Sequence, residues 1–235
     1  MKLPVVILAG GLATRMHPET RTVPKSLLDI CGRPFIDWQL ELLYRQGHTH
    51  IVLCLGHLGA LVEQHVRSGV RTDMFIDFSY DGVLPLGTGG ALRQALPLLP
   101  DAFMVLYGDS YLPISLDEVT TAWMHSGRPC LMTIYPNHSA LDVSNVEYVP
   151  DSVFFYDKKN PNAQMQYIDY GLSILSKQAV LTYSAQGAFD LSDLYHDLVN
   201  TGQMQAHEVA QRFYEIGSPS GRIQTESYLQ QRSLT

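Results

Sequence analysis

The residues best suited to chemistry in this chain lie near its N-terminus, between Val5 and Leu28. An aliphatic run ends at Gly10 and Gly11, and two cations follow, first Arg15 and then Lys25. Glycine lets the main chain approach an anion closely, and free amides with Arg and Lys side chains bind phosphate oxygens. The pattern predicts a loop that binds a ligand with several phosphate groups.

Two common phosphate loops do not fit this segment. A Walker A loop places glycine directly before its lysine, whereas Pro24 precedes Lys25. The dinucleotide fingerprint needs a third glycine at a set spacing, where this chain has Thr14 to Met16. A Gly-Gly pair alone is also typical of an ordinary strand-to-helix turn, but the cations that follow favour the phosphate loop.

The segment resembles the signature of the sugar-1-phosphate nucleotidyltransferases, G-G-x-G-T-R-L-x-P-x-T-x-x-x-P-K. The matching residues are Gly10, Gly11, Thr14, Arg15, Pro18, Thr20, Pro24 and Lys25. Ala13 replaces the third glycine of the signature, and Met16 replaces its leucine. Because alanine tolerates positive φ poorly, we expect negative φ at Ala13 and any left-handed residue of the turn at Gly10 or Gly11.

Composition restricts the class of protein. The chain has 235 residues, 46% of them hydrophobic, and a net charge of −7. This size suits one α/β domain with a large core, and the negative charge argues against nucleic-acid binding. No apolar run is long enough to cross a bilayer, and no signal-peptide cleavage pattern follows Met1 and Lys2, so we expect a cytoplasmic protein without a membrane partner. Whether it forms a homo-oligomer is not readable from the sequence.

Other reactive side chains show no pattern. The three cysteines, Cys31, Cys54 and Cys130, lie in apolar contexts without CxxC spacing, so we expect buried reduced thiols. The nine histidines lack zinc-ligand spacing with neighbouring ligands, and no G-x-S-x-G elbow supports acyl transfer.

Strand and helix patterns alternate through the first half of the chain. The predicted strands are 4–9, 50–55, 74–80, 102–107 and 129–135, and the predicted helices between them are 34–47, 57–67 and 88–98. This order is typical of an α/β fold with a Rossmann-like, doubly wound, mostly parallel sheet. The loops 10–25, 81–90 and 108–111 should then share the rim at the carboxyl ends of the strands, where ligands bind.

The pattern changes from about residue 144. Short strands at 145–149, 152–156 and 167–175 predict a small antiparallel layer, and helices are expected at 190–201 and 218–231. We expect one domain over 1–235, with 1–135 mainly a nucleotide-binding core. Residues 136–235 are then mainly the half that binds the sugar 1-phosphate.

Acidic residues follow two of the strands. Asp109 comes after a buried strand, and a strand-end carboxylate is a suitable ligand for magnesium, although Gly-Asp is also a common turn. The family resemblance implies Mg²⁺ at Asp109 and a second acidic ligand at Glu215, where the family has Asp. The alternative for that segment is a helix cap at Ser218, and both readings are compatible.

The resemblance also implies the nucleotide contacts. The expected residues are Leu8, Ala9, Gly10, Gly11, Ala13, Thr14, Arg15, Gly87 and Thr88. Tyr80, Asp81 and Gly82 are candidates for reading the edge of the base, with no choice among them. A glycine-rich helix start such as 87–90 is also typical of packing alone.

A second set of residues is implied for the sugar 1-phosphate. These are Lys25, Ser144, Asn145, Asp157, Lys158, Asp169 and Gly171. Asp157 and Lys158 match the family's Glu-Lys-Pro element. The alternative for this segment is an exposed charged hairpin, which is the interpretation we adopt for Lys159. Asp169 is also a rival metal ligand.

The resemblance implies in-line attack of a sugar 1-phosphate on the α-phosphorus of a nucleoside triphosphate. Arg15 would hold the β- and γ-phosphates, Lys25 the α-phosphate and Lys158 the sugar phosphate, with Asp109 and Glu215 on Mg²⁺. The chain is most similar to the heptose 1-phosphate guanylyltransferase subgroup of capsule and lipopolysaccharide pathways. Uridylyl-, thymidylyl- and mannose-specific enzymes share the same skeleton, and a silent nucleotide-sugar-binding regulator is the rival from another class.

Overall fold

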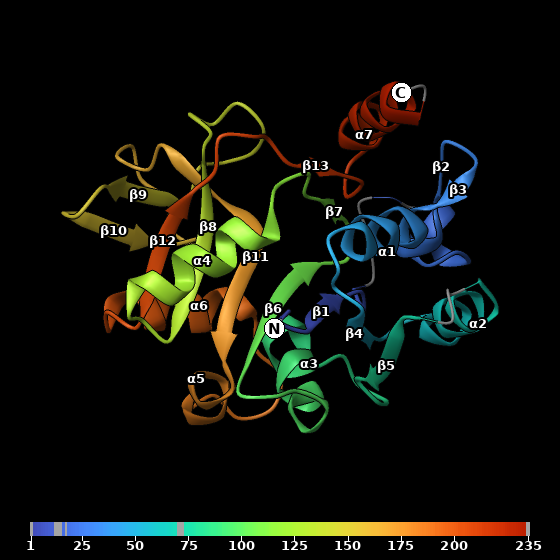
Figure 1. Cartoon of the computed structure of the whole chain (residues 1–235), viewed down its shortest axis with the longest axis horizontal. Helices are drawn as coiled ribbons and strands as arrows, with labels where there is room; N and C mark the ends of the chain where they lie inside the picture. The colour runs from blue at the N-terminus through green and yellow to red at the C-terminus, as the bar shows by residue number, and fades with distance from the viewer. Residues whose placement is uncertain (1, 12–15, 17, 70–72, 234–235) are drawn as a thin grey trace.

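Four parallel strands form the first part of a mixed sheet (Figure 1). The structure is a computed structural model that describes residues 2–11, 16, 18–69 and 73–233. The strands, in the order β6-β1-β4-β5, are β6 (Ala102–Tyr107), β1 (Val5–Leu8), β4 (His50–Leu55) and β5 (Phe75–Tyr80). Helices α1 (Phe35–Arg45), α2 (Gly59–Gly69) and α3 (Gly87–Ala95) connect them, as the sequence pattern predicts.

The strands are apolar throughout because both faces of the sheet are covered. Val6 and Val52 face one core together with α3 and α6 (Leu191–Asn200). Val5 and Ile51 face a second core, which packs against α1, α2 and α4 (Leu116–Ser126). Successive side chains of a strand point to opposite faces, so an apolar run without alternation indicates burial on both sides. None of the described helices is long and apolar enough to cross a membrane.

The second half of the chain extends the same sheet. Strand β11 (Tyr167–Ser176) is antiparallel to β6 and separates it from β8 (Cys130–Pro136), which also pairs with β12 (Met204–Glu208). Strands β9 (Val146–Val149) and β10 (Val153–Tyr156) form a hairpin at the outer edge. The mostly parallel sheet and the antiparallel layer are both confirmed, but the sequence pattern did not place β11 between β6 and β8.

Strand β11 contains an irregular stretch next to the end of β6. Its pairing with β6 stops at Leu172, and its pairing with β9 is at Tyr167. Between these points its register with β8 shifts, and Gly171 has φ +95°. Asp169 therefore lies in the opening where β6 and β9 diverge.

The structure adds elements that the pattern did not predict. Helix α4 begins after Ser115, whose side chain accepts from the Glu118 amide, and ends at Gly127 with φ +63°. Helix α5 (Lys177–Thr182) follows β11, and two short ribbons pair β2 (Asp29–Ile30) with β3 (Arg33–Pro34) and β7 (Ser110–Tyr111) with β13 (Tyr214–Glu215).

The C-terminal helix covers the segment that contains Lys25. Helix α7 (Pro219–Ser233) lies beside β2 and β3 in Figure 1. The Arg222 guanidinium bonds the Glu19 carboxylate and the Asp29 carbonyl oxygen, each at 2.9 Å. A third core lies beneath the helix and contains Met16, Leu28, Ile30, Phe35, Tyr111, Ile216 and Leu229. The chain end thus holds the region after the glycine turn in place.

The glycine-rich start of α3 is a docking surface for the residues before α6. The amides of Gly89 and Gly90 donate to the Phe189 carbonyl oxygen at 3.0 and 3.4 Å, and the Phe189 amide donates to Leu86. A Cβ atom at Gly89 would lie 2.2 Å from the Phe189 ring. This packing joins the two halves of the chain.

We predict that Gly89→Ala destabilises the protein. The new methyl group forces the Phe189 ring aside, and overpacking of this kind costs about 1–3 kcal/mol, of which alanine's better helix propensity returns about 1. The melting temperature should fall by several degrees. Gly69→Ala is the matched control, because among the described residues no atom beyond its chain neighbours and its own helix backbone lies within 4 Å of its Cβ position. Equal melting temperatures for wild type and Gly89→Ala would contradict the docking role.

Candidate active site

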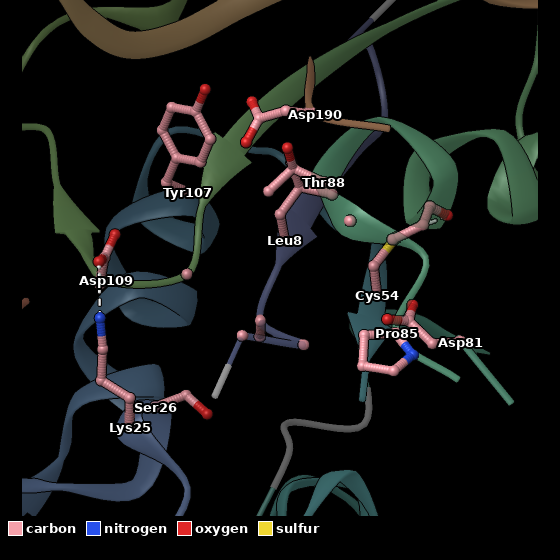
Figure 2. Close-up of a pocket in the computed structure, with 16 residues that line it drawn as sticks. Leu8, Lys25, Ser26, Cys54, Asp81, Pro85, Thr88, Tyr107, Asp109 and Asp190 are labelled. Atoms are coloured by element: carbon pink, nitrogen blue, oxygen red, sulfur yellow. Dashed lines mark hydrogen bonds and ion pairs between the residues drawn. The ribbon is translucent and has the colours of Figure 1, made fainter. Parts of the chain in front are cut away.

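A cavity of about 300 Å³ opens at the carboxyl ends of the parallel strands (Figure 2). The three loops that the sequence placed on one rim contribute to its lining, together with the ends of β1, β4 and β6 and the N-cap of α6. The lining residues are Leu8, Ala9, Gly10, Gly11, Lys25, Ser26, Cys54, Asp81, Pro85, Gly87, Thr88, Ala91, Tyr107, Gly108, Asp109 and Asp190. Ala13, Thr14 and Arg15 lie outside the described residues, so the expectation of negative φ at Ala13 and the role of Arg15 stay predictions.

The described part of the turn after β1 has no left-handed residue. Neither Gly10 nor Gly11 has a left-handed φ, and because residues 12–15 lie outside the described residues, the expectation about the turn stays a prediction. The glycine turn instead lies tightly against the end of β4, because a Cβ atom at Gly10 would lie 3.0 Å from the Gly56 amide nitrogen and one at Gly56 would lie 2.5 Å from the Gly10 carbonyl oxygen. The two strand ends therefore approach each other more closely than a side chain permits.

Asp109 and Lys25 meet in the cavity wall. The Lys25 ammonium lies 3.0 Å from a carboxylate oxygen of Asp109, and the two side chains are 18% and 29% exposed. Gly108 permits this position, because a Cβ atom there would lie 2.7 Å from the Leu8 carbonyl oxygen. The buried Gln39 amide donates to the carbonyl oxygens of Tyr107 and Ser110 at 3.0 and 2.8 Å. The turn that carries Asp109 is thus fixed on both sides.

The donor set at this point fits a divalent cation that takes most of its ligands from phosphates and water. Asp109 offers a carboxylate, whereas Glu215 turns its carboxylate to the Gly217 amide and, at 2.5 Å, to the Ser218 hydroxyl. Ser218 accepts from the Gly221 amide and caps α7, as the alternative reading expected. Within the described residues no group of three His, Cys, Asp or Glu side chains could hold a metal. Magnesium commonly binds through one or two carboxylates with substrate phosphates.

Asp81 lies at the other end of the cavity, next to Pro85 (Figure 2). Its carboxylate accepts from the Leu86 amide at 3.3 Å, and burial raises its pKa above the usual range. Tyr80 instead donates to Glu63, and Gly82 is exposed and does not line the cavity. Of the three candidates for reading a base edge, the structure therefore places Asp81 in the cavity.

Asp190 is a cavity residue that the sequence analysis missed. It is the N-cap of α6 and accepts from the Ser192 amide at 2.9 Å. Burial opposes its charge, but hydrogen bonds from Ser192 and the positive charge of Lys158 outweigh burial and hold its pKa below the usual range. Its neighbour Thr88 accepts from the Leu191 amide. An Asp directly before an amphipathic helix predicts a helix cap. This sequence pattern does not indicate whether the residue also lines a cavity.

Asp169 interacts electrostatically with Lys158 and Asp190. Burial raises its pKa to about 6, against the hydrogen bond from the Gly171 amide and the charge of Lys158. Lys158 is exposed. The structure therefore brings Lys158, Asp169 and Asp190 into electrostatic contact, although Lys158 and Asp169 do not line the cavity itself.

Three residues expected to contact the sugar 1-phosphate instead form hydrogen bonds with other groups of the protein. The Ser144 hydroxyl accepts from the Asn137 side chain and the Ser139 amide at 3.0 and 2.9 Å. Asn145 accepts from the Asp169 amide at 2.9 Å, and Asp157 accepts from the amides of residues 159 and 160. These groups shape the loops around Asp169, and none of them lines the cavity.

Two of the three cysteines are buried as expected, and the third, Cys31, is not. Cys54 and Cys130 are buried and free, and burial raises the pKa of Cys54 to about 12. Cys31 is exposed, because it lies with Gly32 in the tight turn between β2 and β3, where it has φ +53°. No described cysteine is a suitable nucleophile at neutral pH in this cavity.

Comparison with protein families identifies the chain. The nucleotidyl transferase family model matches residues 4–147, which include the glycine turn, Lys25 and Asp109. The chain belongs to the nucleotidyl transferase family. The N-terminal signature on which the resemblance rested therefore lies inside the matched region.

Relatives within this family differ in base and sugar. A mannose-1-phosphate guanylyltransferase catalytic subunit beta from Danio rerio is 27% identical over 91% of this chain, which spans 61% of that protein. A D-glycero-alpha-D-manno-heptose 1-phosphate guanylyltransferase from Campylobacter jejuni is 24% identical over 91% of this chain and 94% of that protein. An N-acetylmuramate alpha-1-phosphate uridylyltransferase from Caulobacter vibrioides is 27% identical over 95% and 96% of the two chains.

A solved structure shares the fold. HddC from Yersinia pseudotuberculosis, complexed with GMP-PN, has a TM-score of 0.80 and 24% sequence identity, and the match covers 97% of this chain and 100% of that one. At this identity the likeness establishes the α/β architecture of the nucleotidyl transferase alone.

We predict that Asp169→Asn stabilises the protein at neutral pH and not in acid. The pKa of Asp169 in the folded protein, about 6, exceeds the value of about 4 for an exposed Asp. The protonated side chain therefore stabilises the fold below about pH 4, and this contribution is lost as pH rises through about 6. Asparagine keeps the acceptor for the Gly171 amide without the charge. Its melting temperature should exceed that of wild type at about pH 7.5, and the difference should shrink at about pH 4.5.

The exposed Asp101→Asn variant controls for the change in net charge. A difference between Asp169→Asn and wild type that is equal at both pH values would show that the folded protein does not bury this charge.

Proposed function

We propose that this nucleotidyl transferase moves a nucleoside monophosphate from a nucleoside triphosphate to a sugar 1-phosphate and releases pyrophosphate. The observation that carries the proposal is the meeting of the glycine turn, Lys25 and Asp109 in one cavity, although Lys25 and Asp109 are 84 positions apart. A cation and a carboxylate beside free main-chain amides suit a phosphate chain with a divalent ion.

The reaction needs no nucleophile from the protein. The second pKa of a phosphate monoester is about 6, so a sugar 1-phosphate is largely a dianion at neutral pH and attacks the α-phosphorus directly. Positioning and neutralisation of charge then supply the catalysis. Lys25 holds the α-phosphate, and its ion pair with Asp109 keeps both groups in place before the substrate enters.

The other roles are those that the family resemblance implies. Arg15, outside the described residues, binds the β- and γ-phosphates, and the exposed Lys158 binds the sugar phosphate. Asp109 holds the divalent ion, Mg²⁺, which when bound neutralises charge on the phosphates. Glu215 would join it only by releasing Gly217 and Ser218.

We propose guanine as the base because of the carboxylate of Asp81. Guanine presents two adjacent donors, N1–H and the 2-amino group, and a carboxylate accepts both. Uracil presents one N–H between two carbonyl oxygens, which repel a carboxylate. Manno-heptose 1-phosphate is the proposed acceptor, supported by the Campylobacter jejuni relative of nearly equal length. Pyrophosphate release with a panel of triphosphates and sugar 1-phosphates tests both assignments, and binding without release would indicate a regulatory nucleotide-sugar-binding protein.

We predict that Asp109→Ala abolishes turnover and leaves the fold intact. Loss of the carboxylate removes the proposed cation ligand and the partner of Lys25, so the rate of pyrophosphate release should fall at least about a hundredfold. Circular dichroism should remain that of wild type. Asp101→Ala, on the exposed surface, is the matched control. A fully active Asp109→Ala protein would exclude the proposed site.

We predict that Asp81→Asn lowers the preference for GTP over UTP. An amide offers only one acceptor atom for two guanine donors, so kcat/KM for GTP should fall about 10- to 100-fold and that for UTP should change little. Tyr80→Phe is the control, because its hydroxyl bonds Glu63 outside the cavity. Equal losses for the two triphosphates would show that Asp81 does not read the base.

A further inference from the structure

Ser26 is a buried cavity residue whose hydroxyl has no partner. Its side chain is 3% exposed, and the Ser26 oxygen has no hydrogen bond in the described structure. It lies directly after Lys25 in the short helix η3 (Lys25–Leu27) and lines the cavity (Figure 2). We propose that the Ser26 hydroxyl binds a phosphate oxygen of the nucleotide, an inference that rests on the proposed function.

An unpaired buried hydroxyl is unusual. Its desolvation carries a free-energy cost that the folded protein normally offsets with a hydrogen bond. Two other buried serines follow the rule: Ser173 bonds the Tyr195 hydroxyl at 2.6 Å, and Ser144 bonds Asn137 and Ser139. The buried Tyr156 hydroxyl is also unpaired, but it does not line the cavity, whereas Ser26 does. The missing partner of Ser26 therefore points to a ligand that enters the cavity.

The position of Ser26 identifies the kind of ligand atom. Its neighbour Lys25 extends to Asp109, so Ser26 lies at the cationic side of the cavity. Asp81 and Pro85, at the proposed base end, lie on the opposite side in Figure 2. A hydroxyl donates most strongly to a charged acceptor, and phosphate oxygens are the charged acceptors of a nucleoside triphosphate. The phosphate chain is thus the part of the substrate that Ser26 meets.

Ser26→Ala tests this role through two effects of opposite sign. The affinity for GTP, measured by calorimetry with Mg²⁺ present, should fall about tenfold, because a charge-assisted hydrogen bond is lost. The melting temperature of the free protein should stay equal or rise, because the variant has lost an unpaired buried group. A serine with a purely structural role would show the reverse, a lower melting temperature and unchanged affinity.

Two further measurements identify the contact. Guanosine, which lacks phosphates, should bind wild type and Ser26→Ala equally, and Ser26→Thr should restore part of the GTP affinity by restoring a hydroxyl. Ser173→Ala is the matched control, with a lower melting temperature and unchanged GTP affinity, because its hydroxyl is already paired.

The outcomes separate this inference from the proposed function. If wild type releases pyrophosphate and Ser26→Ala binds GTP as tightly as wild type, the role of Ser26 is wrong and the proposed function stands. If guanosine and GTP lose affinity equally, Ser26 acts on the base or ribose end and the phosphate contact is wrong. If wild type binds no triphosphate of a panel that includes UTP, both proposals fail.

Discussion

The ion pair between Lys25 and Asp109 depends on several independent features of the fold. Asp109 reaches it because Gly108 lets the end of β6 pass against the end of β1, and because Gln39 bonds the carbonyl oxygens on both sides of the turn. Lys25 reaches it because α7 holds the preceding loop through Arg222 and covers it with a small apolar core. The position of the pair therefore depends on the sheet, the first helix and the C-terminal helix together. Both residues of the pair line the cavity.

A second constraint joins the two halves of the chain. The glycine-rich start of α3 receives Phe189, and this contact fixes Asp190 at the start of α6 on the wall of the cavity. Arg93 strengthens it by stacking over the Phe189 ring and donating to carbonyl oxygens of residues 180–185. The small residues at this helix start therefore serve packing, as the alternative interpretation of the sequence expected. The face toward Phe189 excludes side chains, while Gly87 and Thr88 still line the cavity.

Local pattern predicted the parallel strands and the loops at their carboxyl ends, because burial on both faces leaves a plain apolar signal. It did not predict the position of β11 between β6 and β8, since strand order depends on contacts between distant segments. Asp190 was missed because a helix cap has the same sequence whether or not it borders a cavity. Ser144 and Asn145 were placed near a substrate by resemblance, while their hydrogen bonds to Asn137 and Asp169 depend on a loop path that no spacing rule defines. Cys31 was expected inside from its apolar neighbours, but a tight turn exposes it.

The charge in the cavity explains why the proposed reaction needs more cations than the described lining provides. One cation, Lys25, faces three carboxylates, Asp81, Asp109 and Asp190, in a chain of net charge −7. A triphosphate that entered this lining alone would meet net repulsion. The family resemblance supplies two sources of positive charge, Arg15 from the glycine turn and a divalent ion on Asp109, and both act at the phosphate end. Asp81 lies beside Pro85, away from this end of the cavity, and Asp190 lies near Lys158. In the proposed reaction this uneven distribution of charge would direct phosphates to one side of the cavity and the hydrogen-bond donors of base and sugar to the other.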